Sequence, residues 1–400
     1  MTRHPLAVRL LLVNQFGVNL GFYLLIPYLA THLTEDIGLS VATVGVVLGV
    51  RNLSQQGLFL LGGTASDRLG ARGVIIAGCG LRAVGFGLFA VAGTLPVLLV
   101  AAVLSGVAGA LFNPAVRAYL ALEVGPERRA DAFALFSVYA QAGALLGPVL
   151  GAVLLLVDFR VAAAVAAGVF VLLTAAQAAV LPGREVPPSG GTVWADVRGC
   201  LADRRFAAFT LALSGLYALQ NQLYLILPVE ARRLTGTAGS VAALFVVTTV
   251  VTLLTQVRVT RALSGWPRER SIALGLALMG AAFVPTAVAY AWPPPGEPLP
   301  GAVPIVVSAV LLALGVVVAQ PFALELIPRF AAEGLTGTYF GVFYLGSGAV
   351  AAISTVVIGW AGEGPLGWIG SVLCVLLGLG GAVGVRHLGR RGLLEPEKVA

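Results

Sequence analysis

Charged residues are scarce in this sequence, and so are the residues that build metal sites. Of its 400 residues, 11% are charged and 58% are hydrophobic, whereas a soluble domain carries about 25% charged residues. This composition excludes a fold for which water is the main solvent. Cys79, Cys200 and Cys374 form no CxxC or Cys/His pattern, and the chain holds three histidines. We therefore expect neither a disulfide framework nor a metal site.

Motifs of catalysis are also lacking, and the positive charge is not arranged for nucleic acid. No Ser/His/Asp, Cys/His or phosphate-loop constellation occurs, so we expect no enzyme and no cofactor. The net charge of +7 comes from short basic clusters between apolar runs. Such clusters set the orientation of a membrane protein and do not bind DNA. We expect no nucleic-acid partner.

Long apolar runs recur along the whole chain. Each has about 20 residues, enough for a helix to cross a hydrocarbon core of roughly 30 Å. The runs lack the alternating polarity of β-barrel strands, and the first lacks the cleavage site of a signal peptide. We predict an all-α integral membrane protein of twelve transmembrane helices. The expected helices are residues 8–31, 42–64, 73–93, 96–121, 130–156, 160–181, 206–230, 240–262, 270–291, 302–327, 336–360 and 365–386.

The positions of the basic residues predict the orientation of these helices. With a cytoplasmic N-terminus, 19 of the 25 Lys and Arg residues fall in cytoplasmic segments and three fall in outer loops, while Arg51, Arg82 and Arg117 lie within helices. This bias predicts that both termini are cytoplasmic. We expect a multi-pass protein of the bacterial inner membrane.

A polar stretch near the middle of the chain divides the helices into six and six. Residues 182–205 contain LPGREVPPSGG and then TVWADVRGCLADRR, so we predict an N-terminal bundle over 1–181 and a C-terminal bundle with a tail over 206–400. Trp194, Val197 and Leu201 form one apolar stripe, which suits a helix lying on the inner leaflet. A disordered linker is the alternative.

The segment GGTASDRLGARG joins the second and third helices. It holds Gly63, Asp67, Arg68, Gly70 and Arg72 at the spacing G-x3-D-R-x-G-x-R. This motif resembles the signature loop of the major facilitator superfamily. The resemblance implies that its acid and bases act as a latch between the cytoplasmic ends of the two bundles in the outward-facing state. Ordinary loop charges are the alternative.

The fifth helix reads YAQAGALLGPVLGAVL, with Gly143, Gly147, Pro148 and Gly151. Small residues four apart permit close helix contact, and proline bends a helix. The pattern resembles the helix 5 motif of the superfamily's exporters, although simple packing also explains it.

The resemblance extends over residues 8 to 390 and is nearest to the drug:proton antiporter branch, whose members include bacterial multidrug exporters of the MdtH type. It rests on NLGFYLLIPYLATHL, on the segment from GVVLGVRNLSQQG through GLRAVGFG, and on VLSGVAGALFNPAVRAYL. Two positions depart from the family. Ala102 stands where many proton-driven relatives carry arginine, and Asn14 stands where close relatives carry a carboxylate.

Three arginines lie within expected membrane helices, where an unpaired charge costs several kcal/mol. Arg51 and Gln55 are four residues apart on one helical face, as are Asn113 and Arg117. We interpret these two faces as walls of a hydrated cavity. The alternative is that the arginines donate to backbone carbonyls, and Arg82 is the strongest candidate for such a structural role.

Amides and aromatic residues add to the candidate cavity. The resemblance implies that helices 1, 4, 7 and 10 line it, and aromatic walls with few charges suit amphipathic organic compounds. Packing is the alternative for each aromatic residue. The further candidates are Asn14, Gln15, Asn19, Tyr217, Gln220, Asn221, Tyr224, Tyr339, Phe343 and Tyr344.

Among the acids of the sequence, Glu325 is the one that is embedded in an apolar segment, QPFALELIPR. A carboxylate in a low-dielectric site can exchange a proton near neutral pH, so Glu325 is our candidate for proton coupling. The alternative is an inert ion pair with Arg329 at i+4.

We hypothesise a secondary transporter that exports small lipophilic or amphipathic compounds by alternating access, with protons as the coupling ion. We expect it to work as a monomer in the lipid bilayer. The alternatives are a carrier for one metabolite, such as a sugar or peptide, and a non-transporting membrane sensor.

Overall fold

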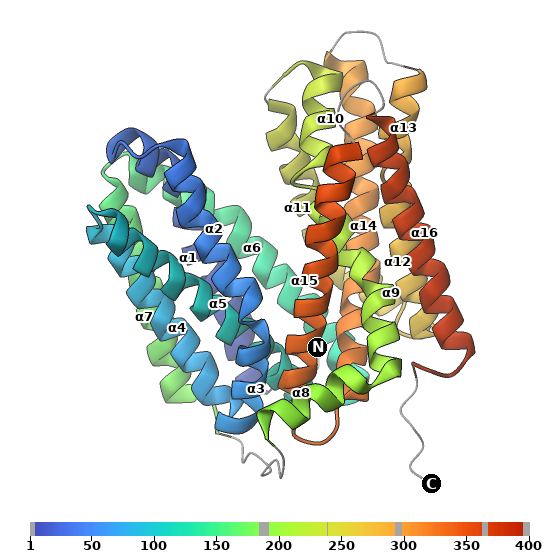
Figure 1. Ribbon diagram of the computed structural model, residues 1–400, viewed down its shortest axis with the longest axis horizontal. Coiled ribbons are helices and arrows are strands. Elements are labelled where there is room, and N and C mark those ends of the chain that lie inside the picture. The colour runs from blue at the N-terminus through green and yellow to red at the C-terminus, as the bar shows by residue number, and fades with distance from the viewer. Residues whose placement is uncertain (1–4, 184–191, 238, 293–297, 362–366, 395–400) are drawn as a thin grey trace. The chain divides into compact units, whose positions relative to one another are not determined.

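The computed structural model describes residues 5–183, 192–237, 239–292, 298–361 and 367–394, and these residues are almost entirely helical (Figure 1). The contacts divide the chain into two compact units. The first unit comprises residues 1–200 and 331–345, and the second comprises residues 201–330 and 346–400. Residues 331–345, which we expected in the C-terminal bundle, therefore belong to the first unit.

The first unit is a helical bundle in which α1 packs on α6 and α7, α4 packs on α5 and α7, and α5 packs on α2 and α3. It also contains most of α8 and the first ten residues of α15. Its helices are α1 (Leu6–Thr31), α2 (Val41–Gly57), α3 (Phe59–Leu69), α4 (Ala71–Val91), α5 (Leu95–Glu123), α6 (Arg129–Leu155), α7 (Phe159–Val180), α8 (Val193–Ala202) and the start of α15 (Thr336–Ala361).

The second unit is built around α12, which packs on α14 and α16, while α11 and α10 pack on α14 and α9 packs on α16. The remainder of α15 belongs to it. Its other helices are α9 (Arg204–Asn221), α10 (Ile226–Thr235), α11 (Gly239–Ala262), α12 (Arg268–Ala281), α13 (Val284–Ala291), α14 (Pro298–Phe330) and α16 (Trp368–Arg390).

Three of the spans that we predicted as continuous helices are broken. The first two breaks precede a proline in the next helix: Pro228 follows the break between α9 and α10, and Pro285 follows the break between α12 and α13. Proline has no N–H to donate to the carbonyl four residues earlier, and its ring crowds that carbonyl. The third break lies after Gly57, where α2 and α3 meet at 45°.

Ten of the described helical segments are long and apolar enough to cross a membrane, and the bent α2–α3 pair makes an eleventh. The pair α9 and α10 covers the remaining predicted span, 206–230. Its two pieces have 18 and 10 residues. The arrangement is consistent with twelve spans in two bundles.

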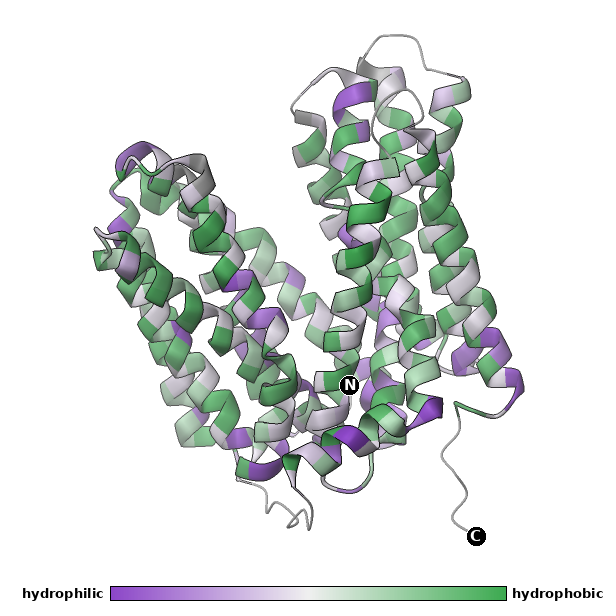
Figure 2. Cartoon of the chain, viewed as in Figure 1, coloured by the Kyte–Doolittle hydropathy of each residue, from purple (hydrophilic) through white to green (hydrophobic). Residues whose placement is uncertain are grey.

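Apolar side chains cover the outside of the helices as well as the inside. Hydrophobic residues run along most helices, and hydrophilic ones gather at helix ends and loops (Figure 2). Large apolar side chains such as Leu172, Val356 and Leu211 are exposed. A surface of this kind is stable against lipid tails.

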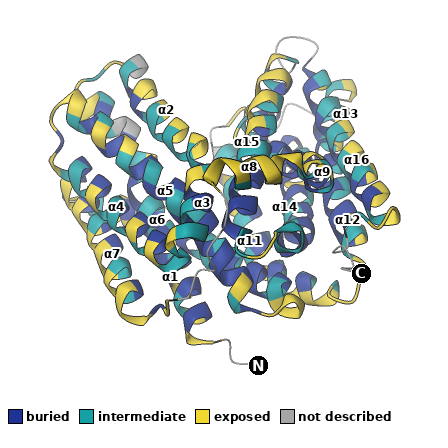
Figure 3. Cartoon of the chain, turned by 60° about the horizontal axis from the view of Figure 1, so that its bottom comes forward, coloured by how far each residue is buried: buried dark blue, intermediate teal, exposed yellow. Residues whose placement is uncertain are grey.

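Helix α8 occupies the second half of the predicted linker. Val197 and Cys200 are buried, whereas Trp194 and Leu201 are exposed, and most of the helix shows an exposed surface (Figure 3). Exposed apolar side chains of this size suit contact with a membrane surface, so the interfacial placement stays our prediction. Residues 184–191 lie outside the described residues.

The glycines of α6 let it lie directly against α1, the close contact that their spacing predicts. A Cβ added at Gly143 would lie 2.9 Å from the backbone nitrogen of Leu20, and one at Gly147 would lie 2.8 Å from the carbonyl oxygen of Leu20. The hydroxyl of Tyr28 donates to the carbonyl oxygen of Pro148 at 2.7 Å. Without side chains at these positions, the two backbones come into contact.

Gly147→Ala should destabilise the first unit, because the added methyl group has to displace the α1 backbone. Overpacking of this kind costs about 1–3 kcal/mol, and we expect a lower unfolding temperature in detergent. Gly168→Ala in α7 is the matched control, because no atom lies within 4 Å of the Cβ position at Gly168. Equal unfolding temperatures for the two variants would show that the α1–α6 contact is not tight.

Candidate functional site

Asp67 lies in the last turn of α3 and accepts hydrogen bonds from the first turn of α15. Its two carboxylate oxygens accept from the backbone N–H groups of Gly337 and Thr338, at 2.7 and 2.6 Å. The close approach requires small residues, since a Cβ at Gly337 would lie 2.7 Å from the Asp67 Oδ1 atom. A carboxylate at this position satisfies N–H groups that have no helical partner and complements the helix dipole.

The arginines of the loop also contact helix ends. Arg72 donates to the carbonyl oxygens of Leu181 and Ala178, both at 2.6 Å, and so covers the C-terminal end of α7. Arg68 forms an ion pair with Asp196 of α8 at 2.7 Å. Gly70 joins α3 to α4 with φ of +86°, a conformation that favours glycine. The motif therefore ties α3 to α8 and α15, and α4 to α7.

Arg51 and Gln55 share a helical face, as their spacing predicts. The Nη2 atom of Arg51 donates to Gln55 Oε1 at 3.0 Å. The Arg51 guanidinium lies 4.6 Å from the ring centre of Phe22. Arg82, which is 5% exposed, lies 5.9 Å from the same ring and 5.8 Å from the ring of Phe112. This group joins α1, α2, α4 and α5.

Arg117 in α5 has a second, separate environment. Its Nη1 atom donates to the carbonyl oxygen of Asn113 at 2.9 Å and to Asn113 Oδ1 at 3.4 Å. Its guanidinium lies 5.0 Å from the ring centre of Tyr344 and 5.4 Å from that of Phe136. The bond to a backbone carbonyl is the contact that the structural alternative proposed, and Arg117 as a whole is half-buried.

The aromatic candidates of α15 pack closely together. Tyr339, Phe343 and Tyr344 are buried. The ring of Tyr344 lies 5.7 Å from that of Phe59 in α3 and 5.6 Å from that of Phe343. The structure thus favours the packing interpretation for these three residues.

Asn14 belongs to a buried polar cluster that joins α1, α4 and α7. Its Oδ1 atom accepts from Gln177 Nε2 at 2.6 Å, and Gln177 Nε2 also lies 3.2 Å from the sulfur of Cys79. Sequence reasoning missed Gln177, the one amide side chain of α7. Gln15 is also buried, whereas Asn19 lies on the face of α1 that contacts Gly143.

The candidates of the second unit lie along α9 and the turn that follows it. Tyr217 and Gln220 are half-buried, and Asn221 and Tyr224 are exposed. The Tyr224 ring lies 5.4 Å from that of Phe245 in α11. Gln222, which sequence reasoning did not single out, is fully buried and donates to the carbonyl oxygen of Ala218 at 3.0 Å.

Glu325 is 1% exposed and has two guanidinium partners. Arg329 lies 2.7 Å from one carboxylate oxygen, and Arg268 of α12 lies 2.9 Å from the other. The Arg329 pair is the one that the alternative interpretation proposed, and the Arg268 pair was missed because it depends on tertiary packing. The role of Glu325 in proton coupling stays a prediction.

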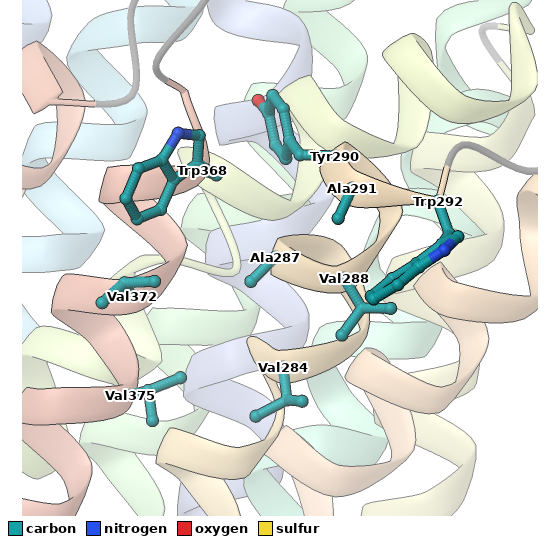
Figure 4. Close-up of a pocket in the computed structure, with 9 residues that line it drawn as sticks. All are labelled: Val284, Ala287, Val288, Tyr290, Ala291, Trp292, Trp368, Val372 and Val375. Carbon is teal, nitrogen blue, oxygen red and sulfur yellow. The ribbon is translucent and has the colours of Figure 1, made fainter.

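Glu230 forms another buried network in the second unit, with Arg233 at 2.7 Å and the hydroxyl of Tyr290 at 2.7 Å. Beside it, a groove of about 570 Å³ lies between α13 and α16, and Figure 4 shows the side chains that line it. Its walls include Val284, Val288, Trp292 and Trp368. None of the predicted cavity residues lines this groove.

The family follows from comparison with known proteins. The family model of the Major Facilitator Superfamily matches residues 11–355. The chain belongs to this superfamily. It is 43% identical to an uncharacterised transporter of the same type from Mycobacterium tuberculosis, over 88% of this chain and 84% of that protein. It is 32% identical to the multidrug resistance protein MdtH of Aeromonas hydrophila, over 84% of this chain and 82% of that one.

The superfamily fold is also seen in the solved structures. The fucose:proton symporter of Escherichia coli matches with a TM-score of 0.74 at 15% identity, over 95% of this chain and 98% of that one. Membership of the superfamily makes this chain a multi-pass membrane transporter and not an enzyme. No cluster of three or more His, Cys, Asp or Glu side chains able to hold a metal ion occurs in the described ranges.

Asp67→Asn should loosen the first turn of α15, because the amide keeps one acceptor but loses the charge that the helix terminus favours. We expect exchange of the Gly337 and Thr338 amide hydrogens to become about tenfold faster, which corresponds to roughly 1.4 kcal/mol. Hydrogen exchange with mass spectrometry on peptides covering residues 336–340 measures this change.

Asp203→Asn is the matched control for this variant. Asp203 accepts from the backbone N–H groups of Arg205 and Phe206 at the start of α9. The Asp203→Asn substitution should therefore speed amide hydrogen exchange at the start of α9 and leave the exchange in α15 unchanged. Unaltered exchange in α15 after Asp67→Asn would contradict the capping role.

Proposed function

We propose that this transporter exports small lipophilic or amphipathic compounds by alternating access, with protons as the coupling ion. The observation that carries the proposal is a set of polar and aromatic side chains on the helices of the first unit, which we assign to the wall of a substrate cavity. The set comprises the half-buried arginines Arg51 and Arg117, the amides of Gln55 and Asn113, and the ring of Phe22. Such a lining holds an organic molecule by apolar area and a few hydrogen bonds.

Two further features support export. The Gly143–Gly147–Pro148–Gly151 pattern resembles the exporters' helix 5 motif and forms the close α1–α6 contact. The multidrug resistance protein MdtH is a relative at 32% identity. The basic residues support a location in the bacterial inner membrane with both termini in the cytoplasm, because 19 of 25 fall in segments of one side.

We assign the signature loop the role of a conformational latch. Asp67 holds the first turn of α15, a helix that begins in the first unit and ends in the second. Releasing this turn would free one end of α15, and alternating access requires such a release once in each cycle.

Accumulation of fluorescent lipophilic dyes in an efflux-deficient bacterial host tests the proposal. Cells that express the protein should accumulate less dye than cells with an empty vector, and collapse of the proton gradient should remove the difference. Arg117→Ala should be expressed normally but lose most of the effect, because its guanidinium contributes to the lining. Equal accumulation in expressing and control cells, over a panel of neutral and charged dyes, would refute export.

Glu325→Gln should abolish transport driven by a pH gradient while substrate binding persists. We propose that a proton binds Glu325 when a conformational change separates it from Arg268 and Arg329, and glutamine imitates the protonated form permanently. The measurement is proton movement on addition of substrate to proteoliposomes.

Glu230→Gln is the control, because Glu230 is also a buried acid with a guanidinium partner. Proton movement at the wild-type rate in Glu325→Gln would exclude Glu325 as the coupling group. Loss of folding in that variant, with folding restored by also replacing Arg268 and Arg329 with glutamine, would instead support the purely structural ion pair.

A further inference from the structure

The helices of the first unit carry positive charge that no acid balances. Arg51 lies in α2, Arg82 in α4 and Arg117 in α5. Residues 1–200 contain nine acids, of which Glu185 lies outside the described residues. The other eight lie in loops, in α8 or at helix ends: Glu35, Asp36, Asp67, Glu123, Glu127, Asp131, Asp158 and Asp196. Where the structure is described, none of the three arginines forms an ion pair.

Arg51 and Arg82 both lie near the ring of Phe22. The guanidiniums of Arg51 and Arg82 lie 4.6 and 5.9 Å from the ring centre of Phe22. A Cβ added at Gly109 would lie 2.8 Å from Gln55 Oε1 and 3.1 Å from Arg82 Nη2. Phe22, Arg51, Gln55 and Arg82 therefore form one group around Gly109, which we call the arginine cluster.

The arginine cluster has unused hydrogen-bond donors. A guanidinium carries five N–H donors. Gln55 Oε1 accepts one of those of Arg51, and the Nε atoms of both Arg51 and Arg82 are buried without an acceptor. Arg82 is 5% exposed, whereas Arg51 is half-buried. Buried charges in proteins are normally paired, so this cluster lacks an anion.

The aromatic rings around the cluster do not replace that anion. Phe22, Phe112 and Phe170 attract the guanidiniums through their π-faces, but a ring carries no net charge. Two like charges in a low-dielectric interior repel each other. An anion beside Arg51 would reduce this repulsion and accept its free hydrogens.

We propose that the arginine cluster binds the anionic group of the transported compound, so that amphipathic organic anions are the preferred substrates. This inference rests on the proposed function. A carboxylate or sulfonate group would accept hydrogen bonds from Arg51, with Arg82 as the second, deeper positive charge. Phe22, which is half-buried beside both, offers a surface for the apolar body. A cationic compound of the same shape would be repelled.

Three dansyl compounds of similar size test the proposal by their charge: dansylglycine is an anion, dansylamide is neutral and dansylcadaverine is a cation. Binding to the purified full-length protein in nanodiscs is measured by dansyl fluorescence. The wild-type protein should bind dansylglycine about tenfold more tightly than dansylamide, the difference expected for a contact with a charged group. It should bind dansylcadaverine most weakly.

Arg51→Gln should remove the preference for dansylglycine and leave the affinity for dansylamide unchanged, whereas Arg51→Lys should retain most of the preference. Gln55→Glu places an acid beside Arg51 without removing the arginine, and should weaken the preference for dansylglycine, because the added carboxylate pairs with the guanidinium. The control is Arg258→Gln in α11, an exposed helical arginine that donates to the carbonyl oxygen of Leu254. It should bind all three compounds as the wild type does.

Equal affinity of the wild-type protein for the three compounds would overturn the proposal, as would an equal loss for all three in Arg51→Gln. If a variant fails to fold, the affinities of the wild-type protein for the three compounds still test the proposal. Charge-selective binding without transport in proteoliposomes would uphold the anion site and refute the transport function. Transport without charge selection would refute the anion site alone.

Discussion

A charge inside the lipid-embedded part of this protein needs compensation, because hydrocarbon supplies none. The second unit compensates its buried acids within the protein. Glu325 is held by Arg268 and Arg329, and Glu230 by Arg233 and Tyr290. The first unit differs, since Arg51 and Arg82 have rings and an amide as neighbours but no acid. This asymmetry is the basis for assigning the anionic part of the substrate to the first unit.

The need to compensate charge also explains the contacts of the signature loop. Helix termini leave N–H and C=O groups without partners, and the termini carry partial charges of opposite sign. Asp67 meets the N-terminal end of α15, and Arg72 meets the C-terminal end of α7. Asp67 and Arg72 thus each have the sign favoured by the helix end that they contact. The contact of Asp67 with α15 consists of two hydrogen bonds from backbone N–H groups.

Much of the fold could be predicted from the sequence, because lipid solvent imposes long apolar runs and short polar breaks. The helix limits agree with the runs except at three breaks: two are followed by Pro228 and Pro285, which were visible in the sequence, and the third lies after Gly57. The pairs within one helix, Arg51 with Gln55 and Asn113 with Arg117, also follow from spacing.

Partners from distant segments could not be predicted in this way. The contacts of Glu325 with Arg268 and of Asn14 with Gln177 depend on which helices pack together. Nor did the spacing indicate that Tyr339, Phe343 and Tyr344 are buried together, since aromatic residues serve packing and binding equally well. The assignment of residues 331–345 to the first unit likewise depends on tertiary contacts such as those of Asp67.

The central claim is that this chain carries a compound across the membrane and does not merely bind it. Counterflow in proteoliposomes tests this claim without any ion gradient. Liposomes preloaded with an unlabelled transported compound should take up the labelled compound transiently above its outside concentration, because an alternating-access carrier exchanges one molecule for another. Saturable binding of the same compound with no counterflow would contradict the account and identify the protein as a receptor.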